Sequence, residues 1–167
     1  MIIFVMGICG SGKSTIGKTL AAELNWTFFD GDDYHSTDSR TKMASGIPLT
    51  DTDRFPWLEH LSQLARDTQL SGGSAVIACS ALKAAYRDIL LQDLAEEDYY
   101  FVFLDISREQ AIERVGQRQA HFMKATMVDS QLACLERPNP ASLPRLIALD
   151  ATLAPCDLIA MIVSVVN

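Results

Sequence analysis

The sequence has few cysteines and no excess of basic charge. Its four cysteines, spread over 167 residues, form no CxxC pair. They match no zinc-module spacing, and this pattern is typical of single reduced thiols. The 14 basic residues are outnumbered by 21 acidic ones, which gives a net charge of −7. We therefore expect no nucleic-acid partner and no anionic membrane partner, because both need a broad basic surface.

Long hydrophobic runs are also absent. Ile2–Met6 is only five residues long and follows no basic stretch, so it does not resemble a signal peptide. Pro155 and Asp157 interrupt the apolar stretch Leu153–Val166, which excludes a membrane span there. We expect a soluble cytoplasmic protein. Its length predicts one domain over residues 1–167, and 49% hydrophobic residues can build a core without disulfides or a structural metal.

Short apolar runs alternate with stretches of helical periodicity along the chain. Strands are expected at Ile2–Met6, Thr27–Asp30, Ala75–Cys79, Tyr100–Ile106 and Leu146–Asp150. Helices are expected at Lys13–Leu24, Trp57–Leu70, Ala81–Leu91, Ser107–Gln117 and Pro155–Val166. Ser80 is a plausible N-cap, and Ser107 with Gln110 forms a capping-box pattern. The alternation predicts an α/β fold, a parallel sheet covered by helices on both faces, with ligands at the carboxyl ends of the strands.

One segment matches a nucleotide-binding motif in full. Residues 7–14 read GICGSGKS, which is the phosphate-loop pattern GxxxxGK[ST] between a predicted strand and a predicted helix. Its glycines allow backbone N–H groups to face phosphate oxygens, Lys13 can reach the β- and γ-phosphates, and the Ser14 hydroxyl can ligate Mg²⁺. The predicted phosphate site contains Gly7, Gly10, Ser11, Gly12, Lys13, Ser14 and Thr15.

An acidic cluster, Asp30-Gly31-Asp32-Asp33, ends the second predicted strand. Three carboxylates this close repel one another unless a cation or a ligand compensates them. In a kinase one of them can accept the proton of the attacking hydroxyl. A solvated turn is the alternative, since Asp and Gly favour turns.

Basic residues follow that cluster. His35, Arg40, Lys42 and Arg54 come first, and two pairs, Lys83 with Arg87 and Arg114 with Arg118, have helical spacing. Singly, each is typical of a solvated surface charge. Jointly, in an acidic protein, they can hold an anionic substrate. The stretch after Arg118, approximately residues 119–137, is predicted to be a lid that keeps water from the phosphoryl group.

Several segments resemble the gluconate kinases, a family of small P-loop sugar-acid kinases. They are GICGSGKST (7–15), DGDDYH (30–35), KMASGIPLTDTDRFPWL (42–58), ACSALKAAYRDIL (78–90), the Arg114 to Met123 stretch and SQLACLERP (130–138). They extend across most of the chain, to about residue 138. The resemblance implies a fold like that of nucleoside monophosphate kinases, with a five-stranded parallel sheet and a lid. It also implies ATP- and Mg²⁺-dependent conversion of D-gluconate to 6-phosphogluconate, and a homodimer.

The resemblance further implies roles for individual residues. Lys13, Asp32 and Arg118 would be catalytic, with Asp32 as the base and Arg118 on the transferring phosphate. Ser14 would hold Mg²⁺ and Asp30 would lie near it, through water. Arg114 would serve the nucleotide. The gluconate site would comprise Asp32, His35, Lys42, Arg54, Lys83, Arg87 and His121.

Three departures from the family pattern leave alternatives open. Ser36 to Ser39 replace a usual Pro-x-x-Asn, Ala120 replaces a glycine, and residues 139–144 lack a usual Asp-Glu pair. One alternative is a related kinase that uses another sugar acid, shikimate or a nucleoside monophosphate. The other is a nucleotide-binding regulator with little catalysis, since fold alone does not fix function.

Overall fold

A computed structural model of the chain describes residues 1–117 and 122–166. Its centre is a five-stranded sheet in which every pair of neighbours is parallel, in the order β2-β3-β1-β4-β5. The strands are β1 (Ile2–Met6), β2 (Thr27–Asp30), β3 (Ala75–Ala78), β4 (Tyr99–Asp105) and β5 (Leu146–Asp150). The predicted α/β fold with a five-stranded parallel sheet is confirmed, and each predicted strand agrees to within one residue at either end.

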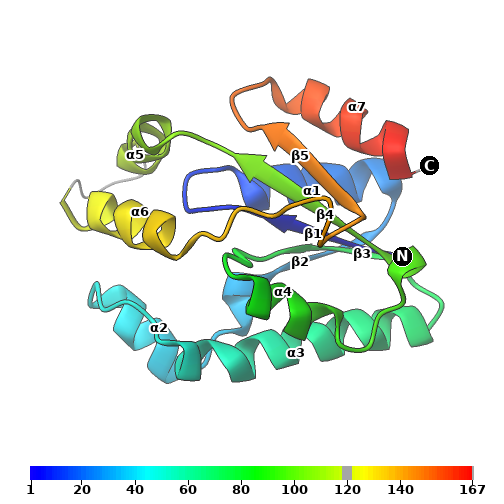
Figure 1. Cartoon of the computed structure of the whole chain (residues 1–167), viewed down its shortest axis with the longest axis horizontal. Helices are drawn as coiled ribbons and strands as arrows, with labels where there is room; N and C mark the ends of the chain where they lie inside the picture. The colour runs from blue at the N-terminus through cyan, green and yellow to red at the C-terminus, as the bar shows by residue number, and fades with distance from the viewer. Residues whose placement is uncertain (118–121, 167) are drawn as a thin grey trace.

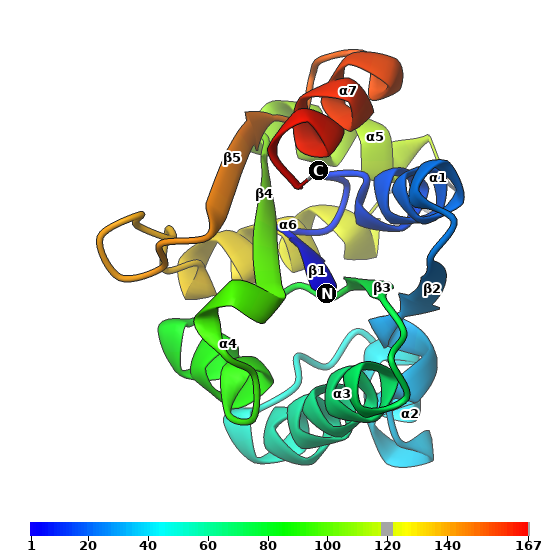
Figure 2. The same ribbon diagram turned by 90° about the vertical axis from the view of Figure 1, so that its right-hand side faces the viewer.

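Helices cover both faces of this sheet (Figure 1). They are α1 (Lys13–Leu24), α2 (Thr37–Ala44), α3 (Asp51–Leu70), α4 (Ala84–Leu91), α5 (Arg108–Gly116), α6 (Phe122–Cys134) and α7 (Pro155–Val166). Two short 3₁₀ helices, η1 (Gly31–Tyr34) and η2 (Glu96–Asp98), follow β2 and precede β4. In Figures 1 and 2, α1 and α7 lie on one side of the sheet, and α3 and α4 lie on the other.

The alternation of side chains along β1 builds a separate core on each face. Ile3 and Val5 belong to the core under α1 and α7, whereas Ile2 and Phe4 belong to the core under α3 and α4. All four are fully buried, as expected for the central strand of a covered parallel sheet. Phe4 stacks on Phe101 of β4, with 4.9 Å between ring centroids. This packing holds the carboxyl end of β1, from which the phosphate loop starts.

Two helices begin at residues other than those expected. Helix α3 starts at Asp51, six residues before the predicted Trp57, because Thr50 and Asp53 form a capping box there. Helix α4 starts at Ala84, with Lys83 rather than Ser80 as its N-cap. Ala81 has a left-handed φ of 45°, so the chain turns before the helix can begin. The capping box of Ser107 and Gln110 at the start of α5 is confirmed.

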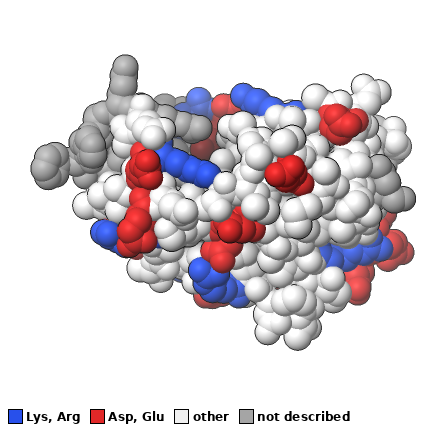
Figure 3. Space-filling model, turned by 90° about the horizontal axis from the view of Figure 1, so that it is seen from above, with Lys and Arg blue, Asp and Glu red and all other residues white. Residues whose placement is uncertain are grey.

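The described surface carries mixed charge. On the face in Figure 3, lysine and arginine side chains are interspersed with aspartate and glutamate, and the described part of that face shows no broad basic patch. Among the described residues, no helix combines the length and the apolar character that a membrane crossing needs.

Candidate active site

The phosphate loop connects β1 to α1 and depends on its glycines. Gly7, Gly10 and Gly12 have φ values of 144°, 83° and 97°, a region that other residues rarely adopt. A Cβ on Gly10 would also lie 2.8 Å from the carbonyl oxygen of Ala111 in α5. The loop therefore packs closely on α5, and a side chain at Gly10 would both strain and displace it.

The polar groups of this loop fit a phosphate. The Lys13 Nζ donates a hydrogen bond to the carbonyl oxygen of Ile8 at 3.0 Å, which folds the side chain back over the loop. Burial lowers the pKa of Lys13, and the nearby Asp32 carboxylate partly opposes that shift. The Ser11 hydroxyl is buried and has no hydrogen-bond partner among the described residues. A desolvated cation beside an unsatisfied hydroxyl at a helix N-terminus matches the needs of an anion.

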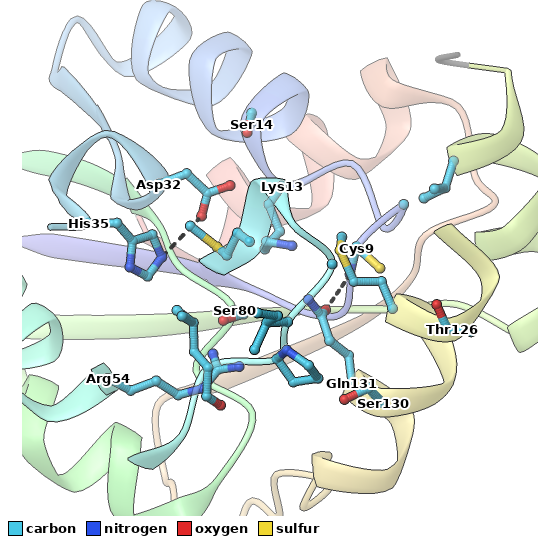
Figure 4. Close-up of a pocket in the computed structure, with 18 of the residues that line it drawn as sticks. Cys9, Lys13, Ser14, Asp32, His35, Arg54, Ser80, Thr126, Ser130 and Gln131 are labelled. Carbon is cyan, nitrogen blue, oxygen red and sulfur yellow. Dashed lines mark hydrogen bonds and ion pairs between the residues drawn. The ribbon is translucent and has the colours of Figure 1, made fainter. Parts of the chain in front are cut away.

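A cavity of about 360 Å³ lies over the loop (Figure 4). It brings together these predicted residues: Gly10, Gly12, Lys13, Ser14, Thr15, Asp32, His35 and Arg54. They come from the phosphate loop, η1 and α3, which the topology brings together at the carboxyl end of the sheet. This is the position that ligands occupy in open α/β folds.

The acidic cluster forms η1, and its aspartates differ in environment. Asp30 caps η1 by accepting a hydrogen bond from the Asp32 N–H at 3.2 Å. Asp32 lines the cavity, and its side chain is 80% exposed, so it can reach a ligand. Gly31 between them is tightly packed, because a Cβ there would lie 2.5 Å from the carbonyl oxygen of Ala78. The predicted turn and the predicted ligand-facing carboxylate are therefore both present. Asp30 is not among the described lining residues, and its place near a metal stays a prediction.

His35 is a buried wall of the cavity. Its ring stacks on Trp57, with 4.1 Å between centroids and 19° between planes. Its Nε2 lies 3.9 Å from a carboxylate oxygen of Asp32, whereas its Nδ1 is buried with no partner among the described residues. Burial lowers the pKa of His35, Asp32 opposes this shift, and Arg54 and Arg40 add to it. The imidazole is thus held neutral near pH 7.

This shift predicts a dependence of stability on pH. Because the folded-state pKa of His35 lies below the unfolded value of about 6.5, the unfolded chain binds the proton more readily. The contribution of neutral His35 to the free energy of unfolding is complete above about pH 6.5. It is lost as the pH falls through the lowered pKa. Urea unfolding at pH 7.5 and at pH 5 measures this loss. The free energy of unfolding should fall less between the two pH values in His35→Gln than in the parent chain.

The control for that experiment is the exposed histidine of α3. His60→Gln removes one imidazole from the surface and should leave the loss between pH 7.5 and 5 as in the parent. An equal loss in His35→Gln and the parent would show that burial of His35 does not produce the dependence.

Ser36 and Ser39, which depart from the family pattern, have a local structural role. The Ser36 hydroxyl caps α2 by accepting from the Ser39 N–H at 3.1 Å. It also donates to the Ser39 hydroxyl at 3.0 Å. Neither serine is among the described residues that line the cavity. The departure therefore alters the start of α2 next to His35 more directly than the cavity wall.

The predicted basic residues differ in their surroundings. Arg54 lines the cavity. Lys42 and Lys83 are engaged in ion pairs: the Lys42 Nζ lies 2.6 Å from Asp53, and the Lys83 Nζ contacts both carboxylate oxygens of Asp51 at 2.8 and 2.9 Å. The Lys42 ion pair and the Thr50 hydrogen bonds lower the pKa of Asp53 to about 2. Neither lysine is among the described lining residues, so contact of either with an acceptor stays a prediction.

Arg87 is not among the described residues that line the cavity. Its guanidinium is buried and donates to the carbonyl oxygens of Ala81 and Leu82 at 2.9 and 3.2 Å. It therefore holds the turn before α4, which includes the left-handed Ala81. This use of its donors does not support the predicted contact of Arg87 with a substrate.

A second cavity lies beside the first, on the side of α5 and α7. Arg114 of α5 lines it and donates to the carbonyl oxygen of Ala151 at 2.8 Å. The two cavities share Gly10, Gly12, Thr15 and Val115. The phosphate loop is thus a wall common to both, and an elongated ligand can occupy them together. The predicted residues Arg118 and His121 lie outside the described residues, as does Ala120.

The predicted lid is largely helical where it is described. Helix α6 covers residues 122–134, and its C-terminal half is bound to the rest of the domain. Asp129 forms a two-point ion pair with Arg108 at 2.6 and 2.9 Å, and Val128 is fully buried. After the helix, Glu136 accepts from the Ala84 N–H at 2.7 Å.

Several residues that line the cavity were not predicted from the sequence to belong to the site. They are Cys9, Met43, Gly46, Ile47, Pro48, Leu49, Ser80, Val115, Thr126, Met127, Ser130 and Gln131. Ser80 was assigned only to a helix cap, although it directly follows a strand end where ligands bind. Ser130 and Gln131 lie in the family-like segment 130–138, which was the available signal. The structure adds a contact: Gln131 Oε1 accepts from the Cys9 N–H at 2.7 Å.

The fold and the phosphate loop define a P-loop kinase. A family model described as shikimate kinase matches residues 9–162. The chain is 42% identical over 163 residues to a probable gluconokinase of Xenopus tropicalis, covering 90% of this chain and 85% of the relative. It is 42% identical over 135 residues to the thermosensitive gluconokinase of Escherichia coli (strain K12), covering 81% and 71%. The chain belongs to the gluconokinase family.

Solved structures agree with this assignment. The match to the structure of a gluconokinase from Sinorhizobium meliloti 1021 covers 95% of this chain and 86% of the gluconokinase chain. Its TM-score is 0.82, and the sequence identity is 38%. The structure of a sugar kinase from Janibacter sp. HTCC2649 matches 98% and 92%, with a TM-score of 0.88 and 39% identity.

Proposed function

We propose that this protein transfers the γ-phosphoryl group of ATP to D-gluconate, giving ADP and 6-phospho-D-gluconate. The observation that carries the proposal is the cavity in which Lys13, Asp32 and Arg54 meet, in a chain of the gluconokinase family. The cavity offers a cation for phosphate, a carboxylate for a hydroxyl and a second cation for an acid. These are the needs of a sugar-acid kinase.

The two adjoining cavities give ATP a place across the phosphate loop. The adenosine part would occupy the cavity lined by Arg114, Leu153 and Pro155. The γ-phosphate would then enter the larger cavity, where Lys13 and Asp32 lie. This arrangement is supported by the shared wall of Gly10, Gly12 and Thr15, since a triphosphate spans the loop from one side to the other.

Mg²⁺ would be held by the Ser14 hydroxyl, with Asp30 acting through water. Ser14 lines the cavity next to Lys13, and hydroxyl and carboxylate oxygens suit this hard cation. When bound, the ion neutralises phosphate charge. The residues present fit it, although the described residues contain no group of three or more His, Cys, Asp or Glu side chains that would bind a metal by themselves. A site completed by phosphate oxygens is consistent with that count.

The chain's own residues would align the reactants and move one proton. Arg54 and the neutral His35 would orient the acceptor, and Asp32 would accept the proton of its attacking hydroxyl. The bond from the γ-phosphorus to the bridging oxygen breaks as the bond to the acceptor oxygen forms, and ADP leaves with the electron pair. Lys13 would stabilise the charge on the phosphoryl oxygens, and the family resemblance gives Arg118 the same role.

The test is ADP release from Mg-ATP with D-gluconate, with shikimate and with other sugar acids in parallel. We expect release with D-gluconate to exceed release with no acceptor by at least about 10²-fold, because a positioned hydroxyl has a large advantage over water. Shikimate is the second candidate acceptor, favoured by the family model that matches residues 9–162. Release with shikimate alone would reassign the acceptor.

ATP binding without transfer to any acceptor would favour the nucleotide-binding regulator. The proposal also includes a cytoplasmic location and a homodimer. The latter is supported by the family resemblance and by the exposed apolar side chains of Met161 and Val165 on α7, which are 45% and 50% exposed.

A further inference from the structure

The amide of Gln131 joins α6 to the phosphate loop across 122 positions of sequence. Its Oε1 accepts a hydrogen bond of 2.7 Å from the backbone N–H of Cys9. A backbone N–H can only donate, so the oxygen of the amide must face Cys9. The NH₂ group must then face the other way, and Gln131 is one of the residues that line the larger cavity. In Figure 4 the amide reaches into the cavity between Cys9 and Ser80.

Among the described residues, none accepts a hydrogen bond from the Gln131 Nε2. Within that part of the chain, both N–H donors of this amide can therefore serve a ligand. Gln131 and Lys13 both line the larger cavity, so the donor pair shares that cavity with the place proposed for the γ-phosphate. Neutral donors fixed at such a position can stabilise negative charge that develops during transfer.

Gln131 is also held firmly enough to act in this way. The two-point ion pair of Asp129 with Arg108 fixes α6 against α5 two residues earlier. The buried Val128 fixes the preceding turn against the core. The Glu136 carboxylate fixes the segment that follows, through the Ala84 N–H. A donor supported from both sides in sequence is pre-organised, so its orientation costs little at the moment of reaction.

We propose that Gln131 is a catalytic residue of phosphoryl transfer, with each end of its amide serving a different purpose. Oε1 positions the phosphate loop through Cys9, and Nε2 donates to a non-bridging oxygen of the phosphoryl group as it moves. No bond to Gln131 forms or breaks, and the proton of the acceptor hydroxyl still passes to Asp32. This inference rests on the proposed function for the identity of the reaction.

Two variants separate the two ends of the amide. Gln131→Glu keeps an acceptor for the Cys9 N–H and loses the donors, whereas Gln131→Met loses both. The exposed Gln92→Glu at the end of α4 is the matched control. Four quantities are measured for each: kcat with the accepted substrate, the melting temperature, the affinity for Mg-ADP and the affinity for a non-hydrolysable Mg-ATP analogue.

For Gln131→Met we expect kcat to fall by about 10²-fold, as on loss of one oxyanion donor. Its affinity for the ATP analogue should fall more than its affinity for ADP, because only the analogue carries a γ-phosphoryl group. Gln131→Glu should keep the melting temperature and ADP affinity of the parent and should lose kcat at least as strongly. Gln92→Glu should match the parent in every measurement.

Two results would overturn the inference. One is Gln131→Glu with kcat within twofold of the parent. The other is an equal loss of affinity for ADP and for the ATP analogue in Gln131→Met, which would make the residue a structural latch only. If the parent chain itself transfers to no acceptor, the proposed function fails, while the ratio of the two nucleotide affinities still tests the contact of Gln131 with the γ-phosphoryl group.

Discussion

Replacement of Lys13 by alanine should lower kcat by about 10³-fold or more, while the fold stays intact. Loss of a pre-organised donor or cation at a transferring phosphoryl group typically costs 10²–10⁵-fold. Lys13 is the cation of the phosphate loop itself, and its Nζ needs only to leave the carbonyl oxygen of Ile8 to reach a phosphate. Initial rates of ADP formation at saturating Mg-ATP and acceptor give kcat directly.

The stability of the Lys13→Ala variant provides an independent check. Burial lowers the pKa of Lys13 in the free protein, so the charged side chain is held there at a cost. Its removal should leave the melting temperature of the unliganded protein unchanged or slightly raised. Stabilisation by added Mg-ATP should be much reduced, because the bound nucleotide would lose its main positive partner.

Lys18→Ala is the matched control for this change. Lys18 lies about one and a half turns further along α1 and is exposed, with its Nζ 5.7 Å from the centroid of the Phe28 ring. Its removal takes one positive charge from the same helix without touching either cavity. Lys18→Ala should keep kcat within twofold of the parent. A Lys13→Ala variant with normal turnover would contradict the assignment of the phosphate loop.

The sheet and the phosphate loop could be predicted because their signals are local. Ile2–Met6 is a continuous apolar run, and the glycines that follow match positions where the backbone must take positive φ values. The capping box of Ser107 and Gln110 is likewise a pattern of neighbours three residues apart. In each case the residues that decide the structure are adjacent in sequence.

The partners of the predicted basic residues could not be read in the same way. Lys83 is paired with Asp51, which lies 32 positions away and which Tyr86 also contacts by a short hydrogen bond. Arg87 has helical spacing from Lys83, yet its guanidinium turns back to the carbonyls before α4. Charge and spacing indicate that a residue can bind an anion. The tertiary structure determines whether that anion is a carboxylate of the protein or a ligand.

The structure of the acidic cluster depends both on its local sequence and on a contact from a distant helix. From composition alone, the three carboxylates at the end of β2 were compatible with a solvated turn and with a ligand site, and only their position at a strand end favoured the ligand site. The choice between them depends on Trp57, which donates to the Gly31 carbonyl oxygen at 2.7 Å and fixes η1 from a helix 26 positions away. With η1 so fixed, Asp32 lines the cavity and Asp33 does not. Replacement of Asp32 and replacement of Asp33 should therefore affect turnover differently.

Asp32→Asn should lower kcat by about 10²–10⁴-fold, the usual contribution of a positioned general base. The amide keeps the size of the side chain and loses the ability to accept the proton of the acceptor hydroxyl. Because the Asp32 side chain is 80% exposed and its neighbour His35 is neutral near pH 7, the melting temperature should change little. The Km for Mg-ATP should change less than kcat, since the phosphates are bound mainly by the loop and Lys13.

Asp33→Asn is the matched control, since it removes an equal charge one residue further on. Asp33 is exposed and its backbone carbonyl, rather than its carboxylate, accepts from Arg40. That variant should keep kcat within twofold. Equal losses in the two variants would mean that the cluster acts through its summed charge. Normal turnover in Asp32→Asn would transfer the role of proton acceptor to another group, and His35, whose Nε2 lies 3.9 Å from the Asp32 carboxylate, would be the next residue to replace.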